Sequence, residues 1–302
     1  MDVGSNSVLL TIEDQTPDGW RPVYESSAVT ALGEGTKTTG VLSEQGMQET
    51  LHELRRAFSK AQEMASDSVV AAATMAARIA TNSSEFIARA AAQHTPIIVL
   101  SGDDEAQLGF ESVATDPLFS KSERLSIVDV GGQSTEIQSA KNLSGWDVLF
   151  RCSFPVGTLG LRSTIFPHEA CEPPEILSAT CHIDELVGRP LDGADPGKVV
   201  LLGATGTNLV SIRERLDRWE PERVHGAFLL FEEVGRAVGW LMPMTDHERS
   251  EIPGIERGRE KTLHIGALIA ERSLFALGAE GCYVSVRGWR HALIELGLPN
   301  ER

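Results

Sequence analysis

The chain has 302 residues, of which 41% are hydrophobic, and it carries a formal charge of −16 at pH 7. This length allows two domains of ordinary size, each with its own core. No run approaches the roughly 20 apolar residues that cross a bilayer, and no signal peptide precedes the first motif. We therefore expect a cytoplasmic protein with no membrane partner. DNA is not expected as a partner, because DNA binding relies on Lys and Arg that neutralise phosphates.

The first part of the chain predicts strands that alternate with helices. Apolar runs predict strands at 8–12, 23–29, 68–73 and 96–100. A helix is expected after Ser43, which is a suitable N-cap and precedes apolar residues at three- and four-residue spacing. Asn82 and Glu85 have the form of a capping box and predict the start of a second helix. Acidic residues at 103–105 predict the first turn of a third helix.

The polar stretch 115–123 is the predicted domain boundary, which gives domains 1–120 and 121–302. The second domain repeats the alternation of the first. Strands are expected near 125–130, 135–139, 147–154, 199–202 and 282–286, and helices after Pro174, near 208–216, 222–242 and 261–277, and at the end as far as Leu296. This order predicts an α/β protein of two related domains with a phosphate-binding cleft between them.

Two short segments, 127 positions apart, couple an Asp to a small-residue turn beside an apolar run. They are Asp2-Val3-Gly4-Ser5-Asn6-Ser7 and Asp129-Val130-Gly131-Gly132-Gln133-Ser134. Glycine lets the backbone approach a ligand closely, so that successive N–H groups can point at phosphate oxygens. The Asp supplies an oxygen for a hard cation such as Mg²⁺, which bridges to phosphate. The pair of segments predicts a two-lobed phosphate clamp.

Further short motifs follow these two segments in the order found in a known family. They are Thr74 through Arg78 to Asn82, Ser101 to Ala106, Phe154 to Gly157, Gly203 to Thr207, Pro253 through Arg259 to Ala267, and Val284 through Gly288 to Arg290. Together the motifs cover nearly the full length. The chain resembles the exopolyphosphatase/guanosine pentaphosphate phosphohydrolase (Ppx/GppA phosphatase) family of the actin-like ATPase superfamily.

The resemblance implies two actin-like (ribonuclease H-like) domains and a hydrolytic reaction. The expected substrate is the terminal phosphoanhydride bond of inorganic polyphosphate, or the 5′ γ-phosphate of guanosine pentaphosphate. The family also implies Mg²⁺, or Mn²⁺, as cofactor, and it makes a homodimer the expected assembly. Phosphoryl transfer suits such a site, because it asks the protein mainly to position groups and to stabilise charge.

The resemblance also implies roles for single residues. Glu105 matches the general base for the attacking water, Asp129 matches an aspartate that holds the metal, and Arg78 matches an arginine that contacts phosphate. Asp129, Glu105 and Asp2 are the expected metal ligands. The expected phosphate-binding residues are Asn6, Ser7, Gly131, Gly132, Gln133, Ser134, Gly203, Thr205, Gly206 and Thr207.

Several positions depart from the family pattern. Gln133 stands where the family usually has a third glycine, and a positive φ there would cost about 1 kcal/mol or more. Its amide could instead donate a hydrogen bond to phosphate and alter which substrates fit. Milder departures are Asp104, Lys261, and His291 with Ala292.

The two ends of the chain also differ from the family pattern. Asp2 directly follows Met1, where relatives carry several apolar residues, so we expect a version extended upstream to be more stable. Longer relatives continue beyond the position of residue 302 with a helical region. Shorter polyphosphate or a nucleotide is therefore the expected substrate.

Two other function classes remain open at this point. One is a regulatory protein that binds polyphosphate, guanosine pentaphosphate or guanosine tetraphosphate without turnover. Gln133 favours this reading, whereas Glu105 and Asp129 argue against it. The other is a sugar or acetate kinase of the same superfamily, which explains both Asp segments but not the Ser101–Ala106 helix start.

Overall fold

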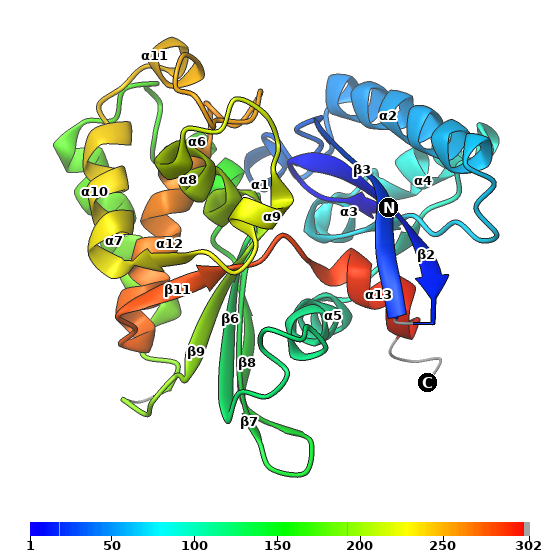
Figure 1. Ribbon diagram of the computed structural model, residues 1–302. Coiled ribbons are helices and arrows are strands. Elements are labelled where there is room, and N and C mark those ends of the chain that lie inside the picture. Colours follow the sequence, from blue (N-terminus) through cyan, green and yellow to red (C-terminus); the bar gives the residue numbers. More distant parts are fainter. Residues whose placement is uncertain (18, 192, 299–302) are drawn as a thin grey trace. The chain divides into compact units, whose positions relative to one another are not determined.

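The computed structural model describes residues 1–17, 19–191 and 193–298, and the chain divides into two compact units (Figure 1). Unit 1 is Met1–Glu105 together with the C-terminal segment from Arg290, and unit 2 is Ala106–Trp289. This division differs from the predicted domains 1–120 and 121–302. The physical reason is helix α5 (Gly102–Ala114), whose residues Phe110 and Val113 are buried in a core of unit 2.

Unit 1 is built on a five-stranded sheet in the order β3-β2-β1-β4-β5. Its strands are β1 (Asp2–Val3), β2 (Ser7–Thr16), β3 (Gly19–Val29), β4 (Ala72–Ala73) and β5 (Ile98–Val99). Its helices are α1 (Thr36–Thr39), α2 (Glu44–Glu63), α3 (Met75–Ile79), α4 (Ser83–Ala92) and nearly all of α13 (Trp289–Leu296). The central strand β1 pairs antiparallel with β2 and parallel with β4.

Unit 2 contains a six-stranded sheet in the order β10-β11-β9-β6-β7-β8. Its strands are β6 (Arg124–Val130), β7 (Thr135–Asn142), β8 (Trp146–Phe154), β9 (Lys198–Leu202), β10 (Phe228–Leu230) and β11 (Gly281–Val284). Its helices, after most of α5, are α6 (Thr158–Thr164), α7 (Pro173–Val187), α8 (Gly203–Glu214), α9 (Pro221–Val224), α10 (Phe231–Leu241), α11 (Asp246–Ser250) and α12 (Leu263–Leu277).

The two sheets share one plan at their centres. Val3 pairs with Val8 across an antiparallel hairpin in unit 1, and Val130 pairs with Thr135 in the same way in unit 2. On its other side each central strand has a parallel neighbour, β4 beside β1 and β9 beside β6. The strand register therefore confirms the prediction of two related α/β domains. In α/β sheets, ligands bind at the carboxyl ends of the parallel strands, and both units have such strands at their centre.

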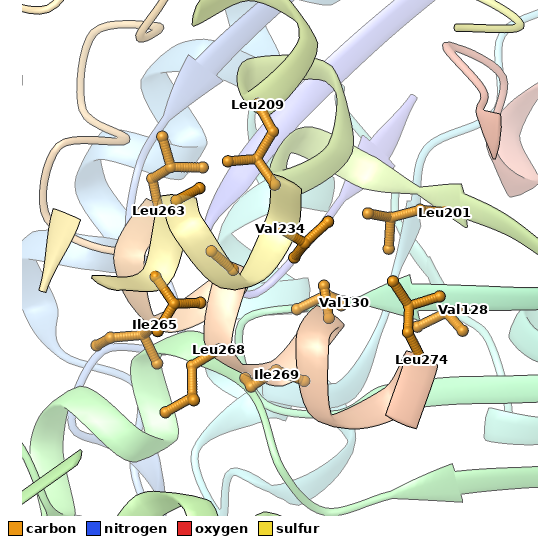
Figure 2. Packing of buried hydrophobic residues seen from close by; sticks show 14 of the residues in the cluster. Val128, Val130, Leu201, Leu209, Val234, Leu263, Ile265, Leu268, Ile269 and Leu274 are labelled. Carbon is orange, nitrogen blue, oxygen red and sulfur yellow. The ribbon is translucent and has the colours of Figure 1, made fainter. Parts of the chain in front are cut away.

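Each unit has its own hydrophobic core, which explains why the chain forms two units. In unit 1 the core packs α2 against the sheet, with Leu54 and Val3 both almost fully buried. In unit 2 helix α12 is buried along most of its length, and Figure 2 shows Leu274 of this helix beside Val128 and Leu201 of the sheet. Among the described residues, none of the helices has the length and apolar content needed to cross a membrane.

Helix starts were predicted with mixed success. Ser43 caps α2 as expected, since its hydroxyl accepts a hydrogen bond from the Gly46 N–H at 3.0 Å. Helix α4 also begins where predicted, but the capping-box assignment is wrong. The Asn82 side chain instead accepts from Leu42 N at 2.8 Å and donates to Leu42 O at 3.0 Å, so it joins two loops.

The strand expected at 68–73 is reduced to Ala72–Ala73, and two further predicted elements also differ from the observed ones. The helix expected at 222–242 is interrupted, because residues 228–230 form β10 and pair antiparallel with β11. The strand expected at 96–100 shrinks to Ile98–Val99, an edge strand with both side chains exposed. In both cases the error arose because a short apolar run forms a strand only where a neighbouring strand pairs with it, and the sequence does not show that neighbour.

Candidate active site

The two Asp-containing segments fold into the same tight turn. In unit 1 the Gly4 N–H donates to Ser7 O at 2.9 Å, and in unit 2 the Gly131 N–H donates to Ser134 O at 2.9 Å. A Cβ placed on Gly131 would lie 2.8 Å from Ser134 O. Glycine is needed at this position because the strands on either side of the turn approach too closely for a side chain.

The unit 1 turn leaves one side-chain donor available. Asn6 is buried, and its backbone carbonyl accepts hydrogen bonds from the N–H groups of Thr30 and Ala31. Its Nδ2 atom is also buried and has no hydrogen-bond partner among the described residues. A buried donor without a partner costs about 1–3 kcal/mol, so this amide is a fitting contact for a phosphate oxygen. Ser7, the next predicted phosphate ligand, is buried at the start of β2.

Ser5, which the sequence reasoning missed, attaches the arginine-bearing helix to this turn. Its hydroxyl accepts a hydrogen bond from Ala76 N at 3.2 Å, at the start of α3. Helix α3 carries Arg78 in its last turn. The only sequence signal for this role was the position of Ser5 directly after Asp2-Val3-Gly4. The fold was needed to show that Ser5 contacts the start of α3.

Arg78 and Glu105 form an ion pair within unit 1. Arg78 Nη1 lies 2.7 Å from Glu105 Oε2 and also donates to Leu100 O at 2.8 Å. The two side chains are 17% and 12% exposed, so most of the contact is shielded from water. The family resemblance implied phosphate binding for the arginine and water activation for the glutamate. The structure brings the two side chains together, so that the guanidinium orients the carboxylate.

In unit 2 the corresponding aspartate lies beside a helix start. Asp129 is half-buried near the end of β6, and a Cβ on Gly203 would lie 3.1 Å from its Oδ1 atom. Gly203 has φ +77° and is the first residue of α8, which also carries Thr205, Gly206 and Thr207. Helix N-termini present unpaired N–H groups and a partial positive charge. Asp129, the predicted metal ligand, therefore lies beside the start of α8, where Gly203, Thr205, Gly206 and Thr207 are predicted to bind phosphate.

Gln133 adopts an ordinary backbone conformation. Its φ is not positive, so the strain considered for a missing third glycine does not arise. The residue is 1% exposed, and a Cβ on Gly157 would lie 2.5 Å from its backbone N. Thr158 N–H also donates to Gly131 O at 3.0 Å. The close approach that needs glycine thus falls on Gly157, which closes the Phe154–Gly157 motif.

Helix α12 places its N-terminal turn against that of α8. A Cβ on Gly266 would lie 2.4 Å from Thr205 Oγ1, so glycine permits this contact between the two helices. The first turns of α8 and α12 therefore lie together in unit 2, and each carries the partial positive charge of a helix N-terminus. This arrangement suits an anion.

Replacing Gly266 with alanine is expected to destabilise the protein by about 1–3 kcal/mol, because the new methyl group overlaps Thr205. Adding Thr205→Ala removes the overlapping hydroxyl and should restore most of that loss in denaturant unfolding. Gly239→Ala is the control, since a Cβ there meets nothing within 4 Å in α10, and it should stabilise slightly. If Thr205→Ala leaves the Gly266→Ala defect unchanged, the proposed contact is not its cause.

Comparisons with known proteins agree with this architecture. The Ppx/GppA phosphatase family matches residues 11–301 of the chain. Exopolyphosphatase 1 of Mycobacterium tuberculosis is 25% identical, over 100% of this chain and 88% of its own length. The crystal structure of the Aquifex aeolicus member of the Ppx/GppA family is 26% identical, with a TM-score of 0.78 over 97% of this chain and 94% of its own. An exopolyphosphatase from Cytophaga hutchinsonii has a TM-score of 0.87 at 22% identity, with 97% and 95% of the two chains covered, and supports the fold alone.

Proposed function

We propose, because the chain belongs to the Ppx/GppA phosphatase family, that this phosphatase removes the terminal phosphate of inorganic polyphosphate. The name of the Mycobacterium tuberculosis relative, exopolyphosphatase 1, supports polyphosphate ahead of guanosine pentaphosphate. The observation that carries the proposal is the repeated turn, closed by the Gly4–Ser7 hydrogen bond in one unit and by the Gly131–Ser134 hydrogen bond in the other. A substrate made of identical anionic groups suits a protein with two copies of one anion-binding turn.

Each turn would bind phosphate through its own backbone and through polar groups that lie beside it. In unit 1 these are the backbone of the turn and the Asn6 amide, whose Nδ2 has no partner among the described residues. In unit 2 they are the Gly131–Ser134 turn and the first turn of α8 at Gly203 to Thr207. Backbone N–H groups at a helix start hold phosphate without needing a net positive chain, which suits a protein of charge −16.

Glu105 would take a proton from the attacking water. The water oxygen forms the new bond to the terminal phosphorus, the bridging P–O bond breaks, and the shortened chain leaves with the bond's electron pair. Arg78 would hold the carboxylate in place, as its 2.7 Å contact indicates. A positioned general base of this kind contributes about 10²–10⁴ in rate.

Asp2 and Asp129 would be the carboxylate ligands of Mg²⁺, or of Mn²⁺. Both are oxygen donors at strand ends beside the anion-binding turns, and Asp129 Oδ1 lies next to the start of α8. Mg²⁺ takes one or two carboxylates and otherwise keeps water and phosphate oxygens. It therefore does not need a cluster of three acidic or His/Cys side chains, of which the described residues contain none. When bound, the metal would offset charge on the phosphate oxygens.

The proposal is tested by phosphate release from polyphosphate of medium length and from guanosine pentaphosphate, each with Mg²⁺ and each at a range of concentrations. We expect a higher kcat/KM for polyphosphate. A higher value for the nucleotide would reassign the substrate within the family. Binding of either compound with no phosphate release would support the regulatory alternative, and transfer of phosphate from ATP to an added acceptor would support a kinase.

Replacing Arg78 with methionine separates the two roles that this residue could have. If Arg78 positions Glu105, kcat falls about ten- to a hundred-fold, with little change in KM. If it mainly binds substrate phosphate, KM rises and kcat changes less. We expect the first result. Arg89→Met is the control, because Arg89 forms exposed ion pairs on α4 of the same unit.

A further inference from the structure

A hollow of about 600 Å³ lies in unit 2, and none of its lining residues is assigned to phosphate above. It is formed by the C-terminal ends of α7 and α12 and by the loop at 193–196, and its lining includes Gly188, Arg189, Asp195, Phe275, Leu277 and Gly278. Small-molecule sites commonly have volumes of about 300–1,000 Å³. The hollow is therefore large enough for an organic ligand.

The electrostatic character of the hollow favours a cation. Helices α7 and α12 both end at its wall, at Val187 and Leu277. Helix C-termini carry a partial negative charge, although here the Gly188 N–H already caps Asp184 O and the Gly278 N–H caps Leu274 O and Phe275 O. Asp195 adds a carboxylate that is exposed and oriented, because its Oδ1 accepts a hydrogen bond from Gly197 N at 2.8 Å. Two converging C-termini disfavour a phosphate or carboxylate ligand.

An exposed aromatic ring gives the hollow an apolar wall. Phe275 is 59% exposed, which is unusual for so large an apolar side chain. The Arg272 guanidinium already lies 4.3 Å from the centre of this ring, and it forms a bidentate ion pair with Asp184 at 2.7 and 2.9 Å. This corner of the hollow thus shows how a cation can bind here, stacked on the ring and paired with a carboxylate.

We propose that this hollow binds an aliphatic organic cation of the diamine or polyamine class. One ammonium group would lie near Asp195 and the carbonyl oxygens that end α7 and α12, and the methylene chain would lie against Phe275. Arg189 at the lining carries a like charge and would oppose the ligand. The net charge of −16 would raise the local concentration of cations around the protein.

The test is calorimetric titration of the full chain with spermidine at low ionic strength. We expect saturable binding at one site. Phe275→Ala and Asp195→Asn should each weaken it about two- to five-fold, and Arg189→Gln should tighten it about two-fold, because a repelling charge is removed. Two matched controls should leave the affinity unchanged. They are Trp219→Ala, which removes another exposed aromatic ring of unit 2, and Asp147→Asn, which removes an exposed carboxylate on β8.

Three results would overturn the proposal. The first is the absence of measurable spermidine binding. The second is binding that Phe275→Ala and Asp195→Asn affect no more than the two controls do, since that result indicates attraction to the acidic surface as a whole. The third is weaker binding by Arg189→Gln, which would indicate that the hollow prefers an anionic group. Mg²⁺ at equal ionic strength should displace spermidine only slightly, because the Phe275 contact favours an organic cation.

Discussion

Replacing Glu105 with glutamine is expected to lower kcat for phosphate release by about 10²–10⁴-fold, because glutamine cannot accept the proton of the attacking water. The two side chains are nearly equal in shape, and the glutamine amide oxygen could still accept a hydrogen bond from Arg78, which lies 2.7 Å from the carboxylate in the native protein. KM should therefore change little. The measurement is steady-state phosphate release from polyphosphate with Mg²⁺, together with a thermal melt to establish that the variant is folded.

Asp103→Asn is the matched control for this variant. Asp103 lies two positions away in the first turn of α5 and is exposed, so its replacement removes the same charge from the same helix start. It should keep nearly full activity. A Glu105→Gln protein that retains more than about a tenth of the native kcat would rule out a general-base role for Glu105.

Replacing His264 with leucine is expected to stabilise the protein, and the gain should grow as the pH falls. His264 lies fully buried near the start of α12, and neither ring nitrogen has a hydrogen-bond partner among the described residues. Burial, helped by the charges of Arg249 and Arg162, lowers the pKa of His264 from 6.5 to about 2. At neutral pH the leucine variant should gain about 1–3 kcal/mol, since an unsatisfied buried polar group is removed.

The sign of the pH effect follows from which state binds the proton. In the folded protein His264 stays neutral down to about pH 2, whereas in the unfolded chain it takes up a proton below about pH 6.5. Acid therefore favours the unfolded state, and stability falls with decreasing pH. Between pH 6.5 and 4.5 this single group accounts for a loss of about 2–3 kcal/mol, which His264→Leu should abolish.

The measurement is denaturant unfolding of the native protein and the variant at several pH values between 7 and 4.5. Taking the difference between the two proteins cancels the titration of other groups. His182→Leu is the control, because it makes the same replacement at an exposed position on α7 in the same unit. A His264→Leu difference that is constant with pH would mean that the buried imidazole is protonated or finds a partner.

Much of the local structure could be read from the sequence because its signals are local. Ser43 caps α2 as predicted, and α12 lies within the predicted 261–277. Predictions failed where a residue's partner lies far along the chain. Asn82 bonds to Leu42 instead of capping its own helix, and residues 228–230 form a strand because β11 lies beside them.

The candidate site divides in the same way. The repeated Asp-x-Gly segments were identifiable in the sequence, and the equal register of their hairpins confirms the repeat. The pairing of Arg78 with Glu105 was not predicted, since the two residues are separated by α4 and β5 and no periodicity connects them. The consequence of Gln133 was also not predictable, because only the backbone conformation decides whether a missing glycine causes strain.

The sequence by itself determined the α/β class and the two related domains, because strand and helix periodicity and the turn glycines act over a few residues. The order of its short motifs carried the resemblance to the family. Tertiary structure alone decided where the units divide, since the side chains of α5 are buried in unit 2 although the polar stretch follows that helix. It also decided that α8 and α12 meet at Thr205 and Gly266. Such contacts join residues distant along the chain, and they form only when separate apolar faces are buried in one core.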